Sequence, residues 1–299
     1  MARRAYDGEV SLHPSDPQAL IDLHAHSSVS DGTESPADLV AAGVAAGLDV
    51  LAITDHDSTA GWVPAFEAAQ GTGITILPGM EVSTQLDGAS VHLLAYLVDP
   101  AHPGLLAETE HIRAERLHRA EAMVQRIAVD YALEWDDVLA QAQPGSTIGR
   151  PHIADALVHR GHVPDRSAAF QSILHWRGGY YRPHLAPKPL TGVELIVAAG
   201  GVPVLAHPGG RGPDRVFSEK RITQMVDAGL AGVEIGHRDN PPASRERWAD
   251  VAERYGLIVT GSSDYHGLGK PNVLAENTTT PENYARIVEL GTGSNPFVG

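Results

Sequence analysis

Residues 20–26 read LIDLHAH, an apolar run that ends in two histidines one residue apart, His24 and His26. Residues two apart on a β-strand point to the same side, so both imidazoles are predicted to share one face of a strand. Six further runs combine an apolar strand pattern with a potential metal ligand at or near a strand end. They are DVLAITDH at 49–56, ITILPGMEV at 74–82, SVHLLAYLVD at 90–99, VPVLAHP at 202–208, GVEIGHRD at 232–239 and LIVTGSSDYH at 257–266.

Alanine-rich helical segments separate most of these runs, and most runs follow a Gly-containing turn. Residues 36–46, for example, have Ser35 as a helix cap, Pro36 in the first turn and Gly47 as the C-terminal stop. Strand-helix alternation of this kind indicates an α/β fold around a parallel sheet, and seven strands suit a TIM-like barrel.

The alternation breaks between about Pro103 and Pro189, where charges and apolar residues recur at helical spacing and no strand pattern is convincing. We therefore predict a barrel formed by residues 20–102 and 190–290, with an inserted helical subdomain at 103–189. The insertion follows the fourth strand, where loops of such barrels elaborate the site. Residues 1–19 and 291–299 are predicted to be loosely ordered ends.

The amino-acid composition limits the cellular location, the partners and the metal ligands that can be expected. The 299-residue chain has no run of about 18 apolar residues and no apolar segment after its start, which predicts a cytoplasmic protein without a membrane partner. A formal net charge of -15 argues against a broad surface for long duplex nucleic acid. The absence of cysteine leaves imidazole and oxygen as metal ligands, which favours zinc, manganese or iron.

The strand-end residues carry the main signal, because strand ends of a parallel barrel meet at one face. Each has an ordinary alternative: His92 as a half-buried histidine, the Thr-Asp-His turn as a helix cap, Glu81 as a strand-end carboxylate. One multinuclear metal site explains them all together, whereas the alternatives require a separate coincidence at each strand.

The chain resembles the PHP family, the polymerase and histidinol phosphatase domain. The resemblance rests on DLHAHSSVSDG at 22–32, ITDHD at 53–57, PGMEVS at 78–83, AHP at 206–208 and SSDYHG at 262–267. In the insertion, TIGRPHIADALVHRG and GGYYRPH look like segments of stand-alone members that act on nucleotides. The resemblance implies a distorted seven-stranded β/α barrel, in agreement with the strands counted above.

The resemblance also implies two or three divalent ions, of Mn, Fe or Zn, in three adjoining ligand sets. The first set is His24, His26, Glu81 and Asp264; the second is Glu81 as a bridge with His92 and His207; the third is Asp31, His56 and His266. Two close metals can share a water and present it as a bridging hydroxide to phosphorus. Glu81 and Asp264 would then support catalysis, and His237 is the candidate general acid on position alone.

Basic and aromatic residues near the ligand-bearing strands are candidate substrate contacts: Arg150, His152, Tyr181, Arg182, His184 and Lys270. An arginine fork matches phosphate oxygens, and Tyr181 or its neighbour Tyr180 could stack on a base. The GRPH segment at 149–152 is equally compatible with a helix start, and the other candidates with surface packing.

These features predict a metal-dependent phosphatase or phosphoesterase that acts on a small nucleotide. Its substrate would be a nucleoside 3′,5′-bisphosphate, a monophosphate-like ligand or a short oligonucleotide end. The alternatives are a histidinol-phosphate-type phosphatase, a non-catalytic metal-binding module and, less favoured, an amide hydrolase. A non-catalytic module predicts lost ligands, which the complete ligand set opposes.

Overall fold

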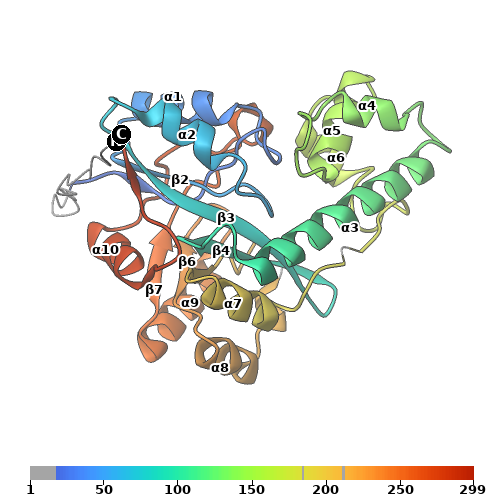
Figure 1. The fold of residues 1–299 in the computed structure, drawn as a ribbon. Coiled ribbons are helices and arrows are strands. Elements are labelled where there is room, and N and C mark those ends of the chain that lie inside the picture. Colours follow the sequence, from blue (N-terminus) through green and yellow to red (C-terminus); the bar gives the residue numbers. More distant parts are fainter. Residues whose placement is uncertain (1–17, 184, 211–212) are drawn as a thin grey trace.

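A nearly closed α/β barrel forms the main body of the protein (Figure 1). The structure, a computed structural model, describes residues 18–183, 185–210 and 213–299. Seven strands follow one another around the sheet in chain order: β1 (Ile21–Asp22), β2 (Val50–Ile53), β3 (Thr75–Leu86), β4 (Ala89–Tyr96), β5 (Val202–Leu205), β6 (Gly232–Gly236) and β7 (Ile258–Gly261). Just beyond β1 and β7, Ala25 pairs in parallel with Tyr265 and brings the two edges together. The predicted α/β barrel of seven strands is confirmed.

One strand departs from the predicted parallel sheet. β4 runs antiparallel to both β3 and β5, while the other neighbouring pairs along the barrel are parallel. The cause is a two-residue hairpin, because Asp87 and Gly88 between β3 and β4 have φ of 50° and 81°. The expectation that all strands run the same way was therefore wrong for β4. The reversal places His92 opposite Ser83, two residues from Glu81, so the hairpin brings both ligand candidates to one end of the barrel.

Helices cover the outside of the barrel: α1 (Pro36–Ala45), α2 (Trp62–Ala69), α7 (Pro189–Ala198), α8 (Glu219–Asp227), α9 (Pro242–Tyr255) and α10 (Pro281–Leu290). The start of α1 follows the sequence prediction, since Ser35 Oγ accepts a hydrogen bond from the backbone N–H of Asp38. Gly47, just past its end, has φ of 77°, a conformation that glycine adopts without steric cost.

Between β4 and β5 the chain forms a helical segment with a small core of its own. It consists of α3 (Pro103–Ile127), α4 (Trp135–Leu139), α5 (Arg150–His159) and α6 (Arg166–Gln171). Figure 1 shows α4–α6 gathered at the far end of the long α3. Met123 and Ile127 of α3 pack there with Ile153 and Leu157 of α5, all fully buried.

The C-terminal residues are held against the sheet. Phe297–Val298 form β8, which pairs with β3, and the Phe297 ring stacks on Phe66 at 5.1 Å. A loosely ordered end does not describe this segment, because main-chain pairing and an aromatic contact both fix it. The other expected loose end falls almost entirely in residues 1–17, outside the described residues. No described helix combines the length and the apolar character needed to cross a membrane.

Candidate metal centre

The nine side chains predicted as metal ligands lie together at one end of the barrel. They are His24, His26, Asp31, His56, Glu81, His92, His207, Asp264 and His266. All are buried except His207, whose side chain is 13% exposed. Imidazole and carboxylate groups that are mostly withdrawn from water need strong partners, which makes this cluster the candidate functional site.

Glu81 is the centre of the cluster. Its Oε1 lies 2.6 Å from His92 Nδ1 and 3.0 Å from His207 Nε2. Its Oε2 lies 3.1 Å from both His26 Nε2 and His56 Nδ1. One carboxylate thus faces imidazoles on both of its oxygens, the arrangement that a bridge between two metals requires.

Two further groups adjoin Glu81. His24 Nε2 and His26 Nε2 lie 3.1 Å apart, and Asp264 Oδ1 lies 3.5 Å and 3.4 Å from them. On the other side, Asp31 Oδ1 is 3.2 Å from His266 Nε2, and its Oδ2 is 3.8 Å from His56 Nε2. The geometry groups His24 and His26 with Asp264, and Glu81 with His92 and His207. It places His56 with His26 and Glu81, and it places Asp31 and His266 with His26, so the predicted third set is divided between two groups.

Unusual backbone conformations hold two of these residues in place. Asp264 follows β7 with φ of 53°, and His207 follows β5 with φ of 26°. Left-handed conformations are rare outside glycine and concentrate at functional sites. They turn the side chains inward as the chain leaves the strand.

Glu234 orients two of the histidines, a role that sequence reasoning missed. Its Oε1 lies 3.0 Å from His24 Nδ1, and its Oε2 accepts a hydrogen bond from the backbone N–H of His207 at 2.9 Å. With His24 Nδ1 donating to Glu234, the Nε2 lone pair faces the cluster. The sequence signal was its place at a strand end, but spacing alone could not separate an orienting carboxylate from a ligand.

The donor set fits divalent metal ions. Among the described residues, His56 Nδ1 and His266 Nε2 are buried without a hydrogen-bond partner, although each lies within about 3.2 Å of a carboxylate oxygen. His266 Nδ1 faces the carbonyl of Asp264 at 2.8 Å, which leaves the Nε2 lone pair free for a cation. Nitrogen and oxygen donors without thiolate suit Zn, Mn or Fe.

Electrostatics keep the carboxylates of the cluster ionised. Burial alone would raise the pKa of Glu81, but the charges of His92, His56 and His24 outweigh burial and hold the pKa well below its usual range. Burial likewise would raise the pKa of Asp264, and Lys270 and His266 reverse the effect. Lys270 Nζ lies 2.6 Å from Asp264 Oδ2. The centre thus presents negative oxygens that a cation can bind.

His237 lies against this cluster. In contrast to His24 and His266, whose Nδ1 atoms face an acceptor, its Nδ1 faces a donor. Its Nδ1 accepts a hydrogen bond from the backbone N–H of Asp239 at 3.0 Å, so a neutral ring carries its proton on Nε2. That nitrogen is buried, 3.4 Å from Asp264 Oδ2, and has no hydrogen-bond partner among the described residues. A nitrogen that carries the ring's proton can donate a hydrogen bond but has no lone pair for a metal ion.

A cavity of about 550 Å³ opens between the loop after β1 and the helical segment. Gly32 and Thr33 line it on the barrel side, and His152 and Arg166 line it on the other side. Arg166 donates to the backbone carbonyl of Asp31 at 3.0 Å, so the cavity adjoins the metal cluster. His152 also caps α5, because its Nδ1 accepts from the backbone N–H of Gly149 at 3.2 Å.

Three other predicted substrate contacts, Arg150, Tyr181 and Arg182, lie at the helical segment. The guanidinium of Arg150 lies 5.5 Å from the centre of the Tyr181 ring and 5.2 Å from that of Phe170. The exposed Arg182 follows Tyr181, and its backbone carbonyl accepts from Arg119 Nε at 2.8 Å. His184 lies outside the described residues.

A buried ion pair ties α3 to the loop that carries His56. Arg116 Nε lies 2.9 Å from Asp57 Oδ2, and Arg116 also donates to Ser83 Oγ on β3. Asp57 in turn accepts from the backbone N–H of Ser83 at 2.7 Å. This contact could not be predicted from the sequence, because Arg116 lies in a helix rich in charged residues.

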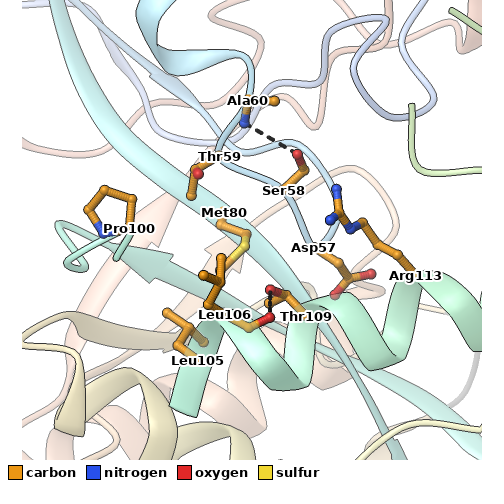
Figure 2. Close-up of a pocket in the computed structure, with 10 residues that line it drawn as sticks. All are labelled: Asp57, Ser58, Thr59, Ala60, Met80, Pro100, Leu105, Leu106, Thr109 and Arg113. Atoms are coloured by element: carbon orange, nitrogen blue, oxygen red, sulfur yellow. Dashed lines mark hydrogen bonds between the residues drawn. The ribbon is translucent and has the colours of Figure 1, made fainter. Parts of the chain in front are cut away.

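A smaller cavity of about 150 Å³ lies near the first half of α3, and Figure 2 shows the residues that line it. Met80, Leu105 and Leu106 line it, and Arg113 points across it toward the loop at Ser58. Met80 precedes Glu81 on β3, and successive strand residues point to opposite faces. This cavity therefore lies on the other face of β3 from the metal cluster.

Comparison with known proteins places this geometry in a family. The PHP domain family matches residues 22–131. The 3′,5′-nucleoside bisphosphate phosphatase of Chromobacterium violaceum is 35% identical over 253 residues, which cover 84% of this chain and 89% of that protein.

Two further relatives agree. The phosphoribosyl 1,2-cyclic phosphate 1,2-diphosphodiesterase of Eggerthella lenta is 30% identical and matches 82% of this chain and 94% of its own length. A crystal structure from Bifidobacterium adolescentis, described as that of a metal-dependent phosphoesterase, has 42% identity and a TM-score of 0.89, covering 92% of this chain and 98% of that one.

Proposed function

The chain belongs to the PHP family and is a metal-dependent phosphoesterase, and from this membership we propose that it hydrolyses a phosphate ester of a small nucleotide. The observation that carries the proposal is the Glu81-centred cluster of nitrogen and oxygen donors beside a cavity of about 550 Å³. A volume in this range suits a ligand of nucleoside size. The relatives named for a nucleoside bisphosphate and a phosphoribosyl cyclic phosphate support the same substrate class.

We assign the metals to the three ligand sets predicted from the sequence. His24, His26, Glu81 and Asp264 would hold one ion; Glu81, His92 and His207 a second; Asp31, His56 and His266 a third. When bound, such ions activate water and neutralise charge on phosphoryl oxygens. Mn, Fe and Zn all suit this donor set.

His237 is the proposed proton donor to the leaving oxygen. Its Nε2–H faces the oxygens of Asp264, and its Nδ1 is occupied by the backbone N–H of Asp239. An alkoxide leaving group needs a proton as the ester bond breaks, and a positioned imidazole can supply it. To act as an acid the ring must first take a second proton at Nδ1, which displaces the Asp239 N–H, so that loss of the Nε2 proton leaves a neutral imidazole. Burial would lower the pKa of His237, but the hydrogen bond to Asp264 and the charge of Glu234 outweigh it and raise the pKa, which favours this doubly protonated form.

Cationic groups on two sides would hold the substrate. Lys270 lies beside Asp264 and can move its ammonium from that carboxylate to a phosphate oxygen. Arg150 and Tyr181 lie at the helical segment, with His152 in the wall of the cavity. Arg182 and His184 stay predictions from the sequence.

Phosphate release across a substrate panel tests the proposal. The protein would be loaded in turn with Mn, Fe or Zn and assayed with nucleoside 3′,5′-bisphosphates, nucleoside monophosphates, a 5′-phosphorylated dinucleotide and histidinol phosphate. We expect the highest kcat/KM with a nucleotide and no turnover after chelation. Preference for histidinol phosphate would favour the alternative phosphatase, and metal binding without turnover of any ester would favour a non-catalytic module.

A further inference from the structure

The smaller cavity, on the other face of β3 from the metal cluster, is not used by the proposed reaction (Figure 2). Its walls come from the loop of residues 57–60, from Met80 of β3 and from the first half of α3. Its volume is about 150 Å³, and cavities of roughly this size hold molecules as small as benzene. The cavity is therefore large enough for a ligand of a few heavy atoms and too small for a nucleotide.

Arg113 is a cation in the wall of this cavity that lacks a balancing anion. Its Nε is buried without a hydrogen-bond partner among the described residues, and none of their carboxylates forms an ion pair with Arg113. Asp57, the one carboxylate in the lining, is bound by Arg116 Nε at 2.9 Å and by the backbone N–H of Ser83 at 2.7 Å. A buried donor without an acceptor costs free energy, and an anionic ligand would supply the missing acceptor.

Two hydroxyl-bearing residues of the loop line the same cavity, and Arg113 points toward them (Figure 2). Ser58 Oγ accepts a hydrogen bond from the backbone N–H of Ala60 at 3.2 Å, which leaves its own hydrogen available. The Thr59 hydroxyl forms no hydrogen bond with the described residues. A guanidinium and two hydroxyl groups can all donate to the oxygens of a phosphate, a phosphonate or a carboxylate.

The rest of the wall is apolar. Met80 and Leu105 are buried, Leu106 is partly exposed, and Pro100 closes this side of the cavity. An inorganic ion would leave these side chains in contact with water, whereas a short alkyl group attached to the anion would cover them. The lining thus favours a ligand with a charged head and a short apolar part.

We propose that this cavity binds a small organic anion, whose oxygens contact Arg113 and the hydroxyls of Ser58 and Thr59 and whose apolar part packs on Met80 and Leu105. The site is separate from the metal centre, although its loop follows His56 directly. Phosphate-like and carboxylate head groups share the required chemistry. No bond is made or broken at this site.

Calorimetry on the metal-loaded protein tests the proposal with butylphosphonate, butyrate, methylphosphonate and 1-butanol. We expect both butyl anions to bind, and the tighter of the two identifies the preferred head group. Methylphosphonate should bind about 10-fold more weakly than butylphosphonate, because it covers less of the apolar wall. Uncharged 1-butanol should show no saturable binding.

Arg113→Met keeps a long apolar side chain and removes the charge, so it should weaken the binding of butylphosphonate on the order of 10–100-fold. Arg119→Met is the matched control, because Arg119 is also half-buried on α3 but contacts Tyr181 outside this cavity. It should bind butylphosphonate as the unmodified protein does. Thr59→Val, which removes a hydroxyl with little change of shape, should weaken binding about 3–10-fold.

Full affinity for butylphosphonate in Arg113→Met would show that the anion binds elsewhere, for example at the metals, and would overturn the proposal. Equal losses in Arg113→Met and Arg119→Met would also overturn it, because they would indicate a general attraction to positive charge. The same holds if neither butyl anion binds, or if 1-butanol binds as tightly as butylphosphonate. Thermal unfolding shows whether each variant is folded, and if Arg113→Met is not, full affinity in Thr59→Val would reject the site.

Discussion

Glu81 connects the candidate metal ligands, because both of its carboxylate oxygens face imidazoles from different strands. We expect Glu81→Ala to fold, since the change removes a polar group rather than barrel packing, but to lose at least one metal equivalent and nearly all turnover. Metal analysis and phosphate release measure both effects. Glu67→Ala, on the exposed face of α2, is the control. Full metal content in Glu81→Ala would refute the bridging role.

His237 makes a second prediction, which depends on the leaving group. His237→Ala should lower kcat for a nucleotide about 10²–10⁴-fold, the range of general acid catalysis. For p-nitrophenyl phosphate, whose leaving group needs little protonation, the loss should be much smaller. His111→Ala, an exposed histidine of α3, should change neither rate. Equal losses with the two substrates would show that His237 only orders the site.

At the scale of single residues, the sequence pointed to the candidate metal ligands but not to the residues that hold them in position. His24 and Asp264 could be found because a strand pattern ends at each. Glu234 and Arg116 could not be given their roles, because one carboxylate at a strand end resembles another and a helical arginine usually faces water. Those roles depend on side-chain directions that only the folded barrel sets.

At the scale of elements, α3 connects the metal cluster to the helical segment through the Arg116–Asp57 pair. The side chains are 10% and 0% exposed, so removing one partner leaves a buried, uncompensated charge. We expect Arg116→Met to lower the free energy of unfolding by about 3–5 kcal/mol. The exposed pair between Arg254 and Glu219 should contribute less than about 1 kcal/mol, so Arg254→Met is the control.

Urea unfolding measures both variants, and the double variant Asp57→Asn with Arg116→Met should recover part of the loss, because the isolated charge is gone. Similar small changes in Arg116→Met and Arg254→Met would mean that water reaches the Asp57 pair.

The elements themselves were mostly predictable, and the exceptions have physical causes. Helix α1 was located by Ser35, Pro36 and Gly47, which act locally. The direction of β4 was missed although Asp87-Gly88 is a strong hairpin signal, because the strand-helix alternation on either side favoured a parallel reading. The short β8 could not be seen, since two residues carry no period and pair only through the folded sheet.

At the scale of the whole molecule, net charge does not predict the charge of a local region. The charge of -15 counts against long nucleic acid, yet arginines from α3 and from the start of α5 meet at Tyr181. No composition argument reveals such a gathering, because it arises when the helical segment folds back along α3.

Metal binding should also reverse the way in which the contribution of His24 and His26 to stability depends on pH. In the metal-free protein, burial would lower the pKa of His26, but hydrogen bonds to Asp264 and Glu81 outweigh it and raise the pKa to about 9. The pKa of His24 is raised in the same sense by Glu234 and Glu81, against the effect of burial. Unfolded histidine titrates near 6.5. This contribution to stability is therefore complete below about pH 6.5 and is lost as pH rises toward 9.

With metal present, stability changes with pH in the opposite direction. A cation binds an imidazole only after the proton has left, so the affinity for metal rises with pH. The stabilisation of the folded state by bound metal therefore rises as well. We therefore expect the difference in Tm between the metal-loaded and the chelator-treated protein to widen steadily from pH 6.5 to 8.5. Thermal unfolding at fixed metal concentration measures it. Glu81→Ala, which should bind metal poorly, should show a small difference throughout. A difference that stayed constant or narrowed over this range in the unmodified protein would mean that His24 and His26 are already neutral before the metal arrives.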